Sequence, residues 1–262
     1  MSYGICNLAA IPMRSEPSER AEMVSQLLFG DAYEVLEEDG KWLKIKTFDC
    51  NYEGWMDKKL HNPLLEQEAA DYATAPKYVV KDFMRIIEDA DTHVHFPIFA
   101  GASFPYPHGG QLQLGNSHFD VGEISESEIS DNSEEKQNAL QNFAALFINA
   151  PYLWGGRTPA GIDCSGFTQL CYKAAGITLP RDASQQVLIG ETVDFISEIM
   201  PGDLAFFQNQ EGNIIHVGMI YQDNQIIHAS GKVRIDILDE TGIFNREKKD
   251  YSHFLRIVKR IL

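Results

Sequence analysis

The second half of the chain places two helical segments before a run of short strands, and this order constrains the fold more than any other feature. Apolar residues from Leu140 to Ile148 recur at the i, i+3, i+4, i+7 and i+8 spacing of an amphipathic helix, and a second such pattern follows Cys164. Five strands are then predicted, at 202–208, 214–221, 225–230, 233–238 and 254–261. Helices first and antiparallel strands afterwards predict an α+β domain, with one sheet face packed on the Cys164 helix.

The first 65 residues are predicted to form a small β-barrel. Short alternating segments are separated by turn signals at intervals of about ten residues, a spacing that suits small barrels. The order of a loop at 14–17, a turn at 28–31 and the segments 42–45 and 54–56 resembles a bacterial SH3-like domain.

Residues 66–137 are predicted to form a second, degenerate SH3-like barrel followed by an acidic linker. Proline and glycine divide 66–118 into short pieces, and the segment 79–87 fits either a helix or a strand. Residues 120–135 carry seven acidic side chains, which indicates a solvated linker. The expected domains are therefore 1–65, 66–137 and 138–262.

Charge and cysteine content limit the partners and the compartment. The formal net charge of −16 argues against nucleic acid or an anionic membrane surface as a partner. No apolar run is long enough to span a bilayer, and no signal peptide is visible, so membrane insertion is not expected. The four cysteines show no paired spacing, which favours a reducing compartment. A cytoplasmic location is expected, with an exported or periplasmic protein that has lost its leader as the alternative.

Cys164 lies where a turn becomes a helix. A thiol at a helix N-terminus feels the positive end of the helix dipole and the unpaired backbone N–H groups, and both favour the nucleophilic thiolate. The alternative is a buried cysteine that acts as a small hydrophobic residue. That alternative suits Cys171, which lies seven residues further along the same apolar stripe.

His216 and His228 lie on two strands of a predicted hairpin, and the loop length decides whether they share a face. A two-residue loop would put them on opposite faces. A three-residue loop ending at Asn224 would place His228 opposite Gly218 and diagonal to His216. Because asparagine tolerates the left-handed conformation that such loops need at their last position, we expect the shared face.

Together these residues predict a Cys-His-His arrangement for attack on a carbonyl group. Cys164 would be the nucleophile, His216 the general base and then the general acid, and His228 the group that orients the imidazole of His216. The backbone N–H of Cys164 and the hydroxyl of Tyr152 are candidate donors to the oxyanion. The alternative is that each histidine has a structural role in a half-buried strand.

A set of motifs then resembles the NlpC-type cell-wall cysteine peptidases in order and spacing. The motifs are Pro151-Tyr152-Leu153-Trp154-Gly155-Gly156, Asp163-Cys164-Ser165-Gly166, Leu179-Pro180-Arg181-Asp182, Pro201-Gly202-Asp203-Leu204, His216-Val217-Gly218 and Ile227-His228-Ala229. The resemblance implies a circularly permuted papain-like fold with Cys164 as nucleophile, His216 as base and His228 as third polar member. SH3-like domains ahead of this domain resemble γ-D-glutamyl-L-diamino acid endopeptidases, which cleave after γ-D-Glu in L-Ala-γ-D-Glu-diaminopimelate or -lysine peptides.

That subfamily requires a free N-terminal L-Ala, and an ammonium group needs a carboxylate in a confined site. Asp163 is placed for this role, with a helix N-cap as its alternative, and Ser165 could contact the substrate backbone or D-Glu. The resemblance implies an acidic residue and a tyrosine from the SH3-like domain, for which Glu53 and Tyr78 are candidates. Glu53 could equally be a solvated turn residue, and Trp154 either lines the site or packs under its loop.

Two other functions remain open from the sequence alone. One is a thiol-dependent amidase or acyltransferase acting on another substrate. The other is a non-enzymatic wall-binding protein in which Cys164, His216 and His228 hold zinc, although a fourth protein ligand is not evident. For the peptidase, no metal or cofactor is expected, and the partners are peptides derived from peptidoglycan during cell-wall recycling.

Overall fold

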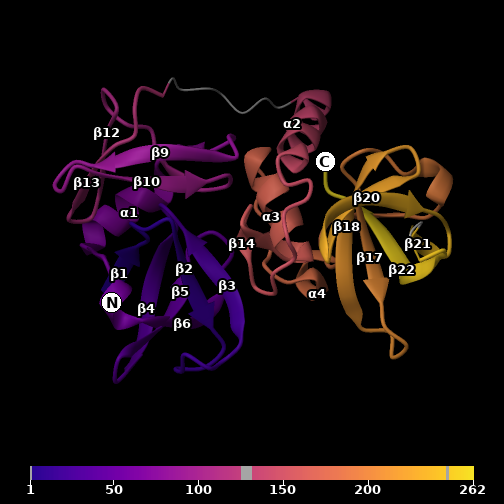
Figure 1. Cartoon of the computed structure of the whole chain (residues 1–262), viewed down its shortest axis with the longest axis horizontal. Coiled ribbons are helices and arrows are strands. Elements are labelled where there is room, and N and C mark those ends of the chain that lie inside the picture. The colour runs from indigo at the N-terminus through magenta and orange to yellow at the C-terminus, as the bar shows by residue number, and fades with distance from the viewer. Residues whose placement is uncertain (1, 125–131, 246–247) are drawn as a thin grey trace. The chain divides into compact units, whose positions relative to one another are not determined.

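The computed structural model describes residues 2–124, 132–245 and 248–262, and the chain divides into two compact units (Figure 1). The first unit contains the residues up to 124 together with 154–158, and the second contains 132–153 and 159–262. Residues 125–131 of the predicted acidic linker lie outside the described residues. Within the described residues, no helix combines the length and apolar character needed to cross a membrane.

A seven-stranded antiparallel sheet, in the order β3-β2-β6-β5-β4-β1-β7, forms the first part of the first unit. Its core is made by the inward-facing residues of alternating strands, including Ile11, Leu27, Tyr33 and Ile45, which are fully buried. This confirms the β-module expected at the start of the chain. The elements are β1 (Ser2–Ile5), β2 (Ala10–Arg14), β3 (Met23–Leu28), β4 (Ala32–Asp39), β5 (Trp42–Thr47), β6 (Glu53–Asp57), the 3-10 helix η1 (Lys58–Leu60) and β7 (Pro63–Leu64).

The rest of the first unit combines one helix with two smaller sheets, ordered β10-β9-β13-β12 and β11-β8. The segment 79–87, which fitted a helix or a strand, contributes the end of β8 and most of β9. The helix α1 was not predicted, and its acidic first turn includes Glu68, which accepts a hydrogen bond from the Leu65 N–H. Likeness to a second SH3-like barrel stays a prediction. The elements are α1 (Glu66–Thr74), β8 (Lys77–Val79), β9 (Met84–Asp89), β10 (Val94–Phe99), β11 (Ser103–Pro105), β12 (Gln111–Leu114) and β13 (Ser117–Asp120).

The segment 154–158, which includes β14 (Arg157–Thr158), is held in the first unit by a buried ion pair. The guanidinium of Arg157 is 2% exposed, and its Nη1 lies 2.9 Å from the carboxylate of Asp31. Gly155 adopts φ +74°, and a Cβ there would lie 2.3 Å from the carbonyl oxygen of Met23. The close approach to β3 therefore requires glycine at this position.

The second unit is an α+β fold, as predicted, and its antiparallel sheet closes into a barrel, which was not predicted. Strands β22, β17, β18, β19, β20 and β21 pair in this order, β21 pairs back to β22, and β16 extends the sheet beside β22. The elements are α2 (Ser133–Ala145), β15 (Gly161–Ile162), α3 (Cys164–Ala174), α4 (Ala183–Gln186), β16 (Glu191–Val193), the 3-10 helix η2 (Ile196–Glu198), β17 (Leu204–Gln208), β18 (Ile214–Gln222), β19 (Gln225–Ser230), β20 (Lys232–Leu238), β21 (Gly242–Asn245) and β22 (Asp250–Arg260).

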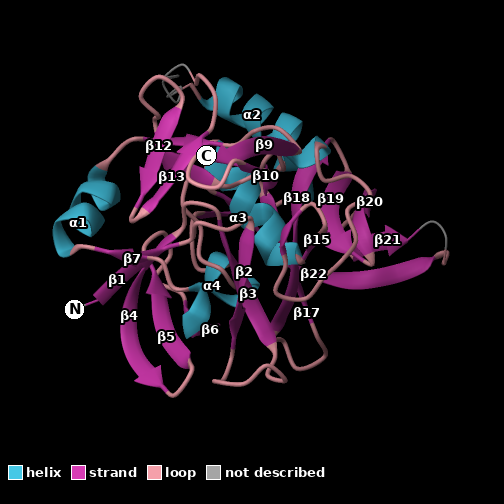
Figure 2. Ribbon diagram, turned by 60° about the vertical axis from the view of Figure 1, so that its left-hand side comes forward, coloured by secondary structure: helices cyan, strands magenta, loops and turns pink. Residues whose placement is uncertain are grey.

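The helix that begins at Cys164 packs against the barrel, as expected from its apolar stripe. α3 contacts β18 and β19 (Figure 2), and Phe167, Leu170 and Cys171 are fully buried. Several features differ from the prediction, among them the short strands β15 and β16, which were not expected. Helix α2 begins earlier than expected because Asn132 caps its first turn, and the four-residue strand β21, which closes the barrel, was not predicted.

The Arg157–Asp31 pair gives a prediction for the first unit. Replacing Arg157 with Met should lower the free energy of unfolding by about 3–5 kcal/mol, because it leaves the buried carboxylate of Asp31 without its cation. The measurement is urea denaturation followed by tryptophan fluorescence, which reports on this unit because Trp42, Trp55 and Trp154 all lie in it.

The control variant is Lys41→Met, which removes the exposed Lys41–Glu19 pair and should leave the urea midpoint almost unchanged. Equal midpoints for the Arg157 and Lys41 variants would contradict the role given to the buried pair.

Candidate active site

Cys164 is the first residue of α3, directly after the N-cap residue Asp163. The carboxylate of Asp163 accepts a hydrogen bond of 2.7 Å from the N–H of Gly166, which fixes the start of the helix. The thiol is 7% exposed, and the backbone N–H groups of Val217 and Ser165 lie within hydrogen-bond reach of its sulfur. Because Val217 follows His216 on β18, the sulfur lies beside the strand that carries this histidine.

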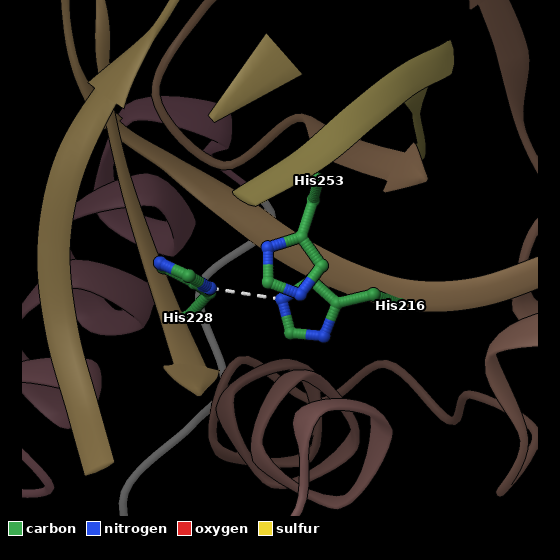
Figure 3. A group of neighbouring side chains, drawn as sticks. All are labelled: His216, His228 and His253. Carbon is green, nitrogen blue, oxygen red and sulfur yellow. Dashed lines mark hydrogen bonds between the residues drawn. The ribbon is translucent and has the colours of Figure 1, made fainter. Parts of the chain in front are cut away.

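His216 and His228 share one face of the barrel wall, and their rings are hydrogen-bonded. Nε2 of His216 lies 2.8 Å from Nδ1 of His228 (Figure 3). The β18–β19 register pairs Met219 with Ile227, so one further step places His228 opposite Gly218, as expected. A Cβ on Gly218 would lie 2.7 Å from the Cδ1 of Ile226 and 2.8 Å from the Cβ of His228, so the glycine provides space for these two side chains of β19.

The loop that produces this register differs from the prediction. Gln222 pairs with Gln225, so the hairpin has a two-residue loop, and Asp223 rather than Asn224 adopts a positive φ of 32°. A bulge at Tyr221 inserts the extra residue that restores the shared face. The expected three-residue loop was therefore wrong, although the face it predicted for the histidines is the observed one.

Asp236 on β20 extends the pair to a chain of three groups. Its Oδ2 lies 3.1 Å from Nε2 of His228, and Arg234 lies 2.7 Å from the same oxygen. Burial opposes ionisation of Asp236, but the hydrogen bonds from His228 and Arg234 outweigh it and lower the pKa of the carboxyl group. The ionised carboxylate can only accept, so Nε2 of His228 must donate.

This hydrogen-bond chain determines which nitrogen of His216 carries the proton. Neutral His228 with a proton on Nε2 has a lone pair on Nδ1, so Nδ1 accepts from His216. Nε2 of His216 therefore carries the proton, and its Nδ1 has the lone pair that a general base needs. In Figure 3 this second nitrogen lies on the side of the ring away from His228.

A third histidine, His253 on β22, stacks on His216. The ring centroids are 4.1 Å apart and the planes differ by 23°. His253 was missed because the predicted strand began at residue 254, whereas β22 begins at Asp250. The signal that could have found it is the two-residue alternation of β22, which places His253 on the same face as Tyr251 and Leu255.

Asp163, expected to bind a substrate ammonium, is engaged with protein groups. Arg181 Nη1 and Nη2 lie 3.0 and 2.5 Å from its two carboxylate oxygens, and Nη1 also donates to the Oγ of Ser165 at 3.0 Å. All three residues are buried. The geometry therefore favours the N-cap alternative, because the guanidinium neutralises the carboxylate that would attract an ammonium group.

Tyr152 is half-buried near the nucleophile, and burial, together with the neighbouring Cys164 and Asp163, raises the pKa of its hydroxyl. Its hydroxyl therefore stays protonated and able to donate, as the oxyanion role requires.

Three predicted substrate residues belong to the first unit. Glu53 forms an ion pair of 2.9 Å with Lys44, Tyr78 packs on Phe104, and Trp154 donates to Glu22 at 2.5 Å. Their contribution to substrate binding stays a prediction.

Burial changes the expected charge state of the site. It raises the pKa of the Cys164 thiol to about 11, and the neighbouring Asp163 adds to the increase, while the N–H groups of Val217 and Ser165 act against it. Burial also holds the pKa of His216 well below the ordinary histidine range, and His228 and His253 lower it further. The expectation that the helix terminus would favour a thiolate was wrong, because burial raises the pKa of the thiol by more than the neighbouring N–H groups and Arg181 lower it.

The site thus presents a neutral thiol next to an imidazole whose lone pair and orientation are fixed by a buried carboxylate. This is the arrangement of a cysteine peptidase, in which proton transfer to the imidazole accompanies attack by sulfur.

Comparison with known proteins agrees with this class. The profile of the NlpC/P60 family matches residues 149–250, and that of a bacterial dipeptidyl-peptidase SH3 domain matches residues 13–59. A protein named gamma-D-glutamyl-L-lysine dipeptidyl-peptidase from Bacillus subtilis is 30% identical over 256 residues, covering 85% of this chain and 78% of its own length. The chain belongs to the NlpC/P60 family and is a cysteine peptidase.

Two further proteins extend the similarity over the chain. Dipeptidyl-peptidase 6 from Lysinibacillus sphaericus is 27% identical over 259 residues, which cover 86% of this chain and 88% of the relative. The crystal structure of an NlpC/P60 family protein from Bacillus cereus covers 100% of both chains with a TM-score of 0.83 at 23% identity. The structural similarity establishes the fold.

The charge state of the site gives a second prediction. Alkylation of Cys164 by iodoacetamide should accelerate by about tenfold per pH unit between about pH 6 and about pH 9, because only the thiolate reacts and its pKa lies near 11. The rate is measured by mass spectrometry of the peptide that contains Cys164. The measurement is made on protein that carries Cys50→Ser, so that Cys50 does not react. The other two thiols, those of Cys6 and Cys171, are fully buried. A rate that is independent of pH above neutrality would indicate a preformed thiolate–imidazolium pair and refute the prediction.

Proposed function

We propose that this chain hydrolyses the γ-D-glutamyl–diamino acid bond of peptidoglycan stem peptides with a free N-terminal L-Ala, and recycles peptides released from the wall in the cytoplasm. The observation that carries the proposal is the chain of Asp236, His228 and His216 ending beside the Cys164 thiol. The relatives named gamma-D-glutamyl-L-lysine dipeptidyl-peptidase support the bond and the substrate class.

The proposed reaction begins when the sulfur of Cys164 attacks the γ-carbonyl carbon of D-Glu. The thiol proton passes to Nδ1 of His216, and the tetrahedral oxyanion accepts hydrogen bonds from the Cys164 N–H and the Tyr152 hydroxyl. The imidazolium of His216 is stabilised through His228 and the negative charge of Asp236.

The same proton then moves to the amine of the diamino acid as the C–N bond breaks, which leaves a thioester on Cys164. Water attacks this thioester while His216 accepts a proton from the water. The carboxylic acid product and the thiol form when the S–C bond breaks and the proton returns to sulfur, and the acid then loses its proton to water. Each step uses Nδ1 of His216, whose lone pair depends on the tautomer set by Asp236.

Recognition of the free amine requires a negative group near the end of the substrate. Arg181 forms hydrogen bonds with both Asp163 and Ser165 beside the nucleophile. Because Arg181 neutralises the carboxylate of Asp163, the substrate ammonium group needs a different carboxylate. Contributions from Glu53, Tyr78 and Trp154 remain predictions. The amidase or acyltransferase alternative has no specific observation in its favour. The non-enzymatic zinc protein is set aside because the chain is a cysteine peptidase.

The function is tested with L-Ala-γ-D-Glu-L-Lys, its diaminopimelate counterpart and the N-acetylated form of each. The free peptides should be cleaved to L-Ala-D-Glu and the diamino acid, and acetylation should reduce kcat/KM strongly because it removes the ammonium charge. Cys164→Ala should abolish turnover. The control variant Cys50→Ser, which removes a free thiol of the first unit, should retain turnover. Turnover by Cys164→Ala would refute the nucleophile, and equal rates on free and acetylated peptides would refute the proposed specificity.

The tautomer argument predicts a large effect of Asp236→Asn. The carboxamide can donate to Nε2 of His228, which moves the proton of each histidine to the opposite nitrogen and removes the lone pair from Nδ1 of His216. kcat should fall by about 10²–10⁴-fold with little change in KM. Asp239→Asn is the matched control. Asp239 lies on the same barrel and accepts a hydrogen bond from the hydroxyl of Tyr251, but it takes no part in the hydrogen bonds that link Asp236, His228 and His216. A kcat within about twofold of wild type for Asp236→Asn would show that Asp236 does not set the tautomer.

A further inference from the structure

The imidazole of His253 can bind a metal ion or a proton, and the proposed reaction does not use it. Ring nitrogens of His216, His228 and His253 lie within 4.8 Å of one another, and each ring offers one ligand atom to the cluster. Figure 3 shows the three rings gathered on one side of the barrel wall, from β18, β19 and β22. Three imidazoles in this arrangement match the protein ligands of open zinc sites.

We propose that His216, His228 and His253 form a binding site for a divalent transition ion, Zn²⁺ by preference, and that the bound ion inactivates the peptidase. The inhibitory part rests on the proposed function, whereas ion binding does not. Neutral imidazole suits Zn²⁺, and a water molecule would complete the tetrahedron.

The spacing of the nitrogens is close to what the ion needs. Zn–N bonds of about 2.0–2.1 Å place tetrahedral ligand nitrogens about 3.3 Å apart. The His216–His228 separation of 2.8 Å is slightly short, and the remaining separations reach at most 4.8 Å. The ion therefore requires the first pair to open slightly and the ring of His253 to tilt from its stacked position. His253 is only partly buried, which leaves room for this movement.

The groups behind the rings already orient two of the ligands. Asp236 accepts from Nε2 of His228, which directs the lone pair of Nδ1 into the cluster. The Oγ of Ser252 lies 2.9 Å from Nδ1 of His253, which leaves Nε2 of that ring for the ion. Metal-ligating histidines commonly bond through their second nitrogen to such carboxylate or polar partners.

Inactivation follows from the tautomer of His216. An ion on Nε2 takes the lone pair of that nitrogen, so the proton of the neutral ring moves to Nδ1. Nδ1 then has no lone pair for the thiol proton of Cys164. The ion thus switches off the base without contacting the sulfur, and no net proton is released.

Binding is measured on the intact chain carrying Cys164→Ala, by calorimetry with ZnCl₂ and by the absorption spectrum with Co²⁺. This variant should bind one ion, and the Co²⁺ spectrum should lack a sulfur charge-transfer band. Adding His253→Phe, which keeps an aromatic ring against His216, should weaken binding by at least about tenfold. Ser252→Ala is a milder second variant, expected to weaken binding while leaving the ring in place.

Inhibition is measured with the stem peptide on chains that retain Cys164, each compared with its own zinc-free rate. Zn²⁺ should inhibit wild type, chelation should restore the rate, and His253→Phe should raise the inhibitory concentration by at least about tenfold. Loss of binding in Cys164→Ala, or unchanged binding in both the His253 and Ser252 variants, would overturn the site. Binding without inhibition would overturn the regulatory role. Absence of peptide cleavage would refute only the proposed function, since the binding measurements need no turnover.

Discussion

The carboxylate of Asp236 is the group on which the chemistry of the site depends. It fixes the proton of His228 on Nε2, and this in turn fixes the proton of His216 on Nε2 and the lone pair on Nδ1. The three residues come from successive strands β18, β19 and β20, so the register of the barrel holds the hydrogen bonds in place. A slip of one residue in any pairing would send one side chain to the other face.

Burial determines which charge states Cys164 and His216 favour. Burial raises the pKa of the thiol and lowers the pKa of the imidazole, because removal from water disfavours the charged form of each group. The proton can therefore move only when the attack on a carbonyl group provides the driving force. The N-terminus of α3 positions the thiol of Cys164 and provides backbone N–H groups, and the barrel provides the base, His216.

Much of the site could be predicted from local sequence. The helix spacing after Cys164 and the two histidine strands follow from short-range patterns. The shared face of the histidines was predicted from a three-residue loop, whereas it arises from a two-residue loop and a bulge at Tyr221. Asp236 was not predicted, because an acidic residue on an alternating strand also fits a solvent-facing position until the β19–β20 register is known. His253 and the Asp163–Arg181 pair depend on contacts between distant segments. The pKa of Cys164 was predicted in the wrong direction, because the helix dipole is a local property and burial is a tertiary one.

The most direct test of the account is the tautomeric state of the two buried histidines, measured by ¹⁵N NMR of the histidine-labelled protein at neutral pH. Chemical shifts that assign the proton to Nε2 of His216 and to Nε2 of His228, in neutral rings, are the predicted result. A proton on Nδ1 of His216, or a doubly protonated ring, would contradict the account.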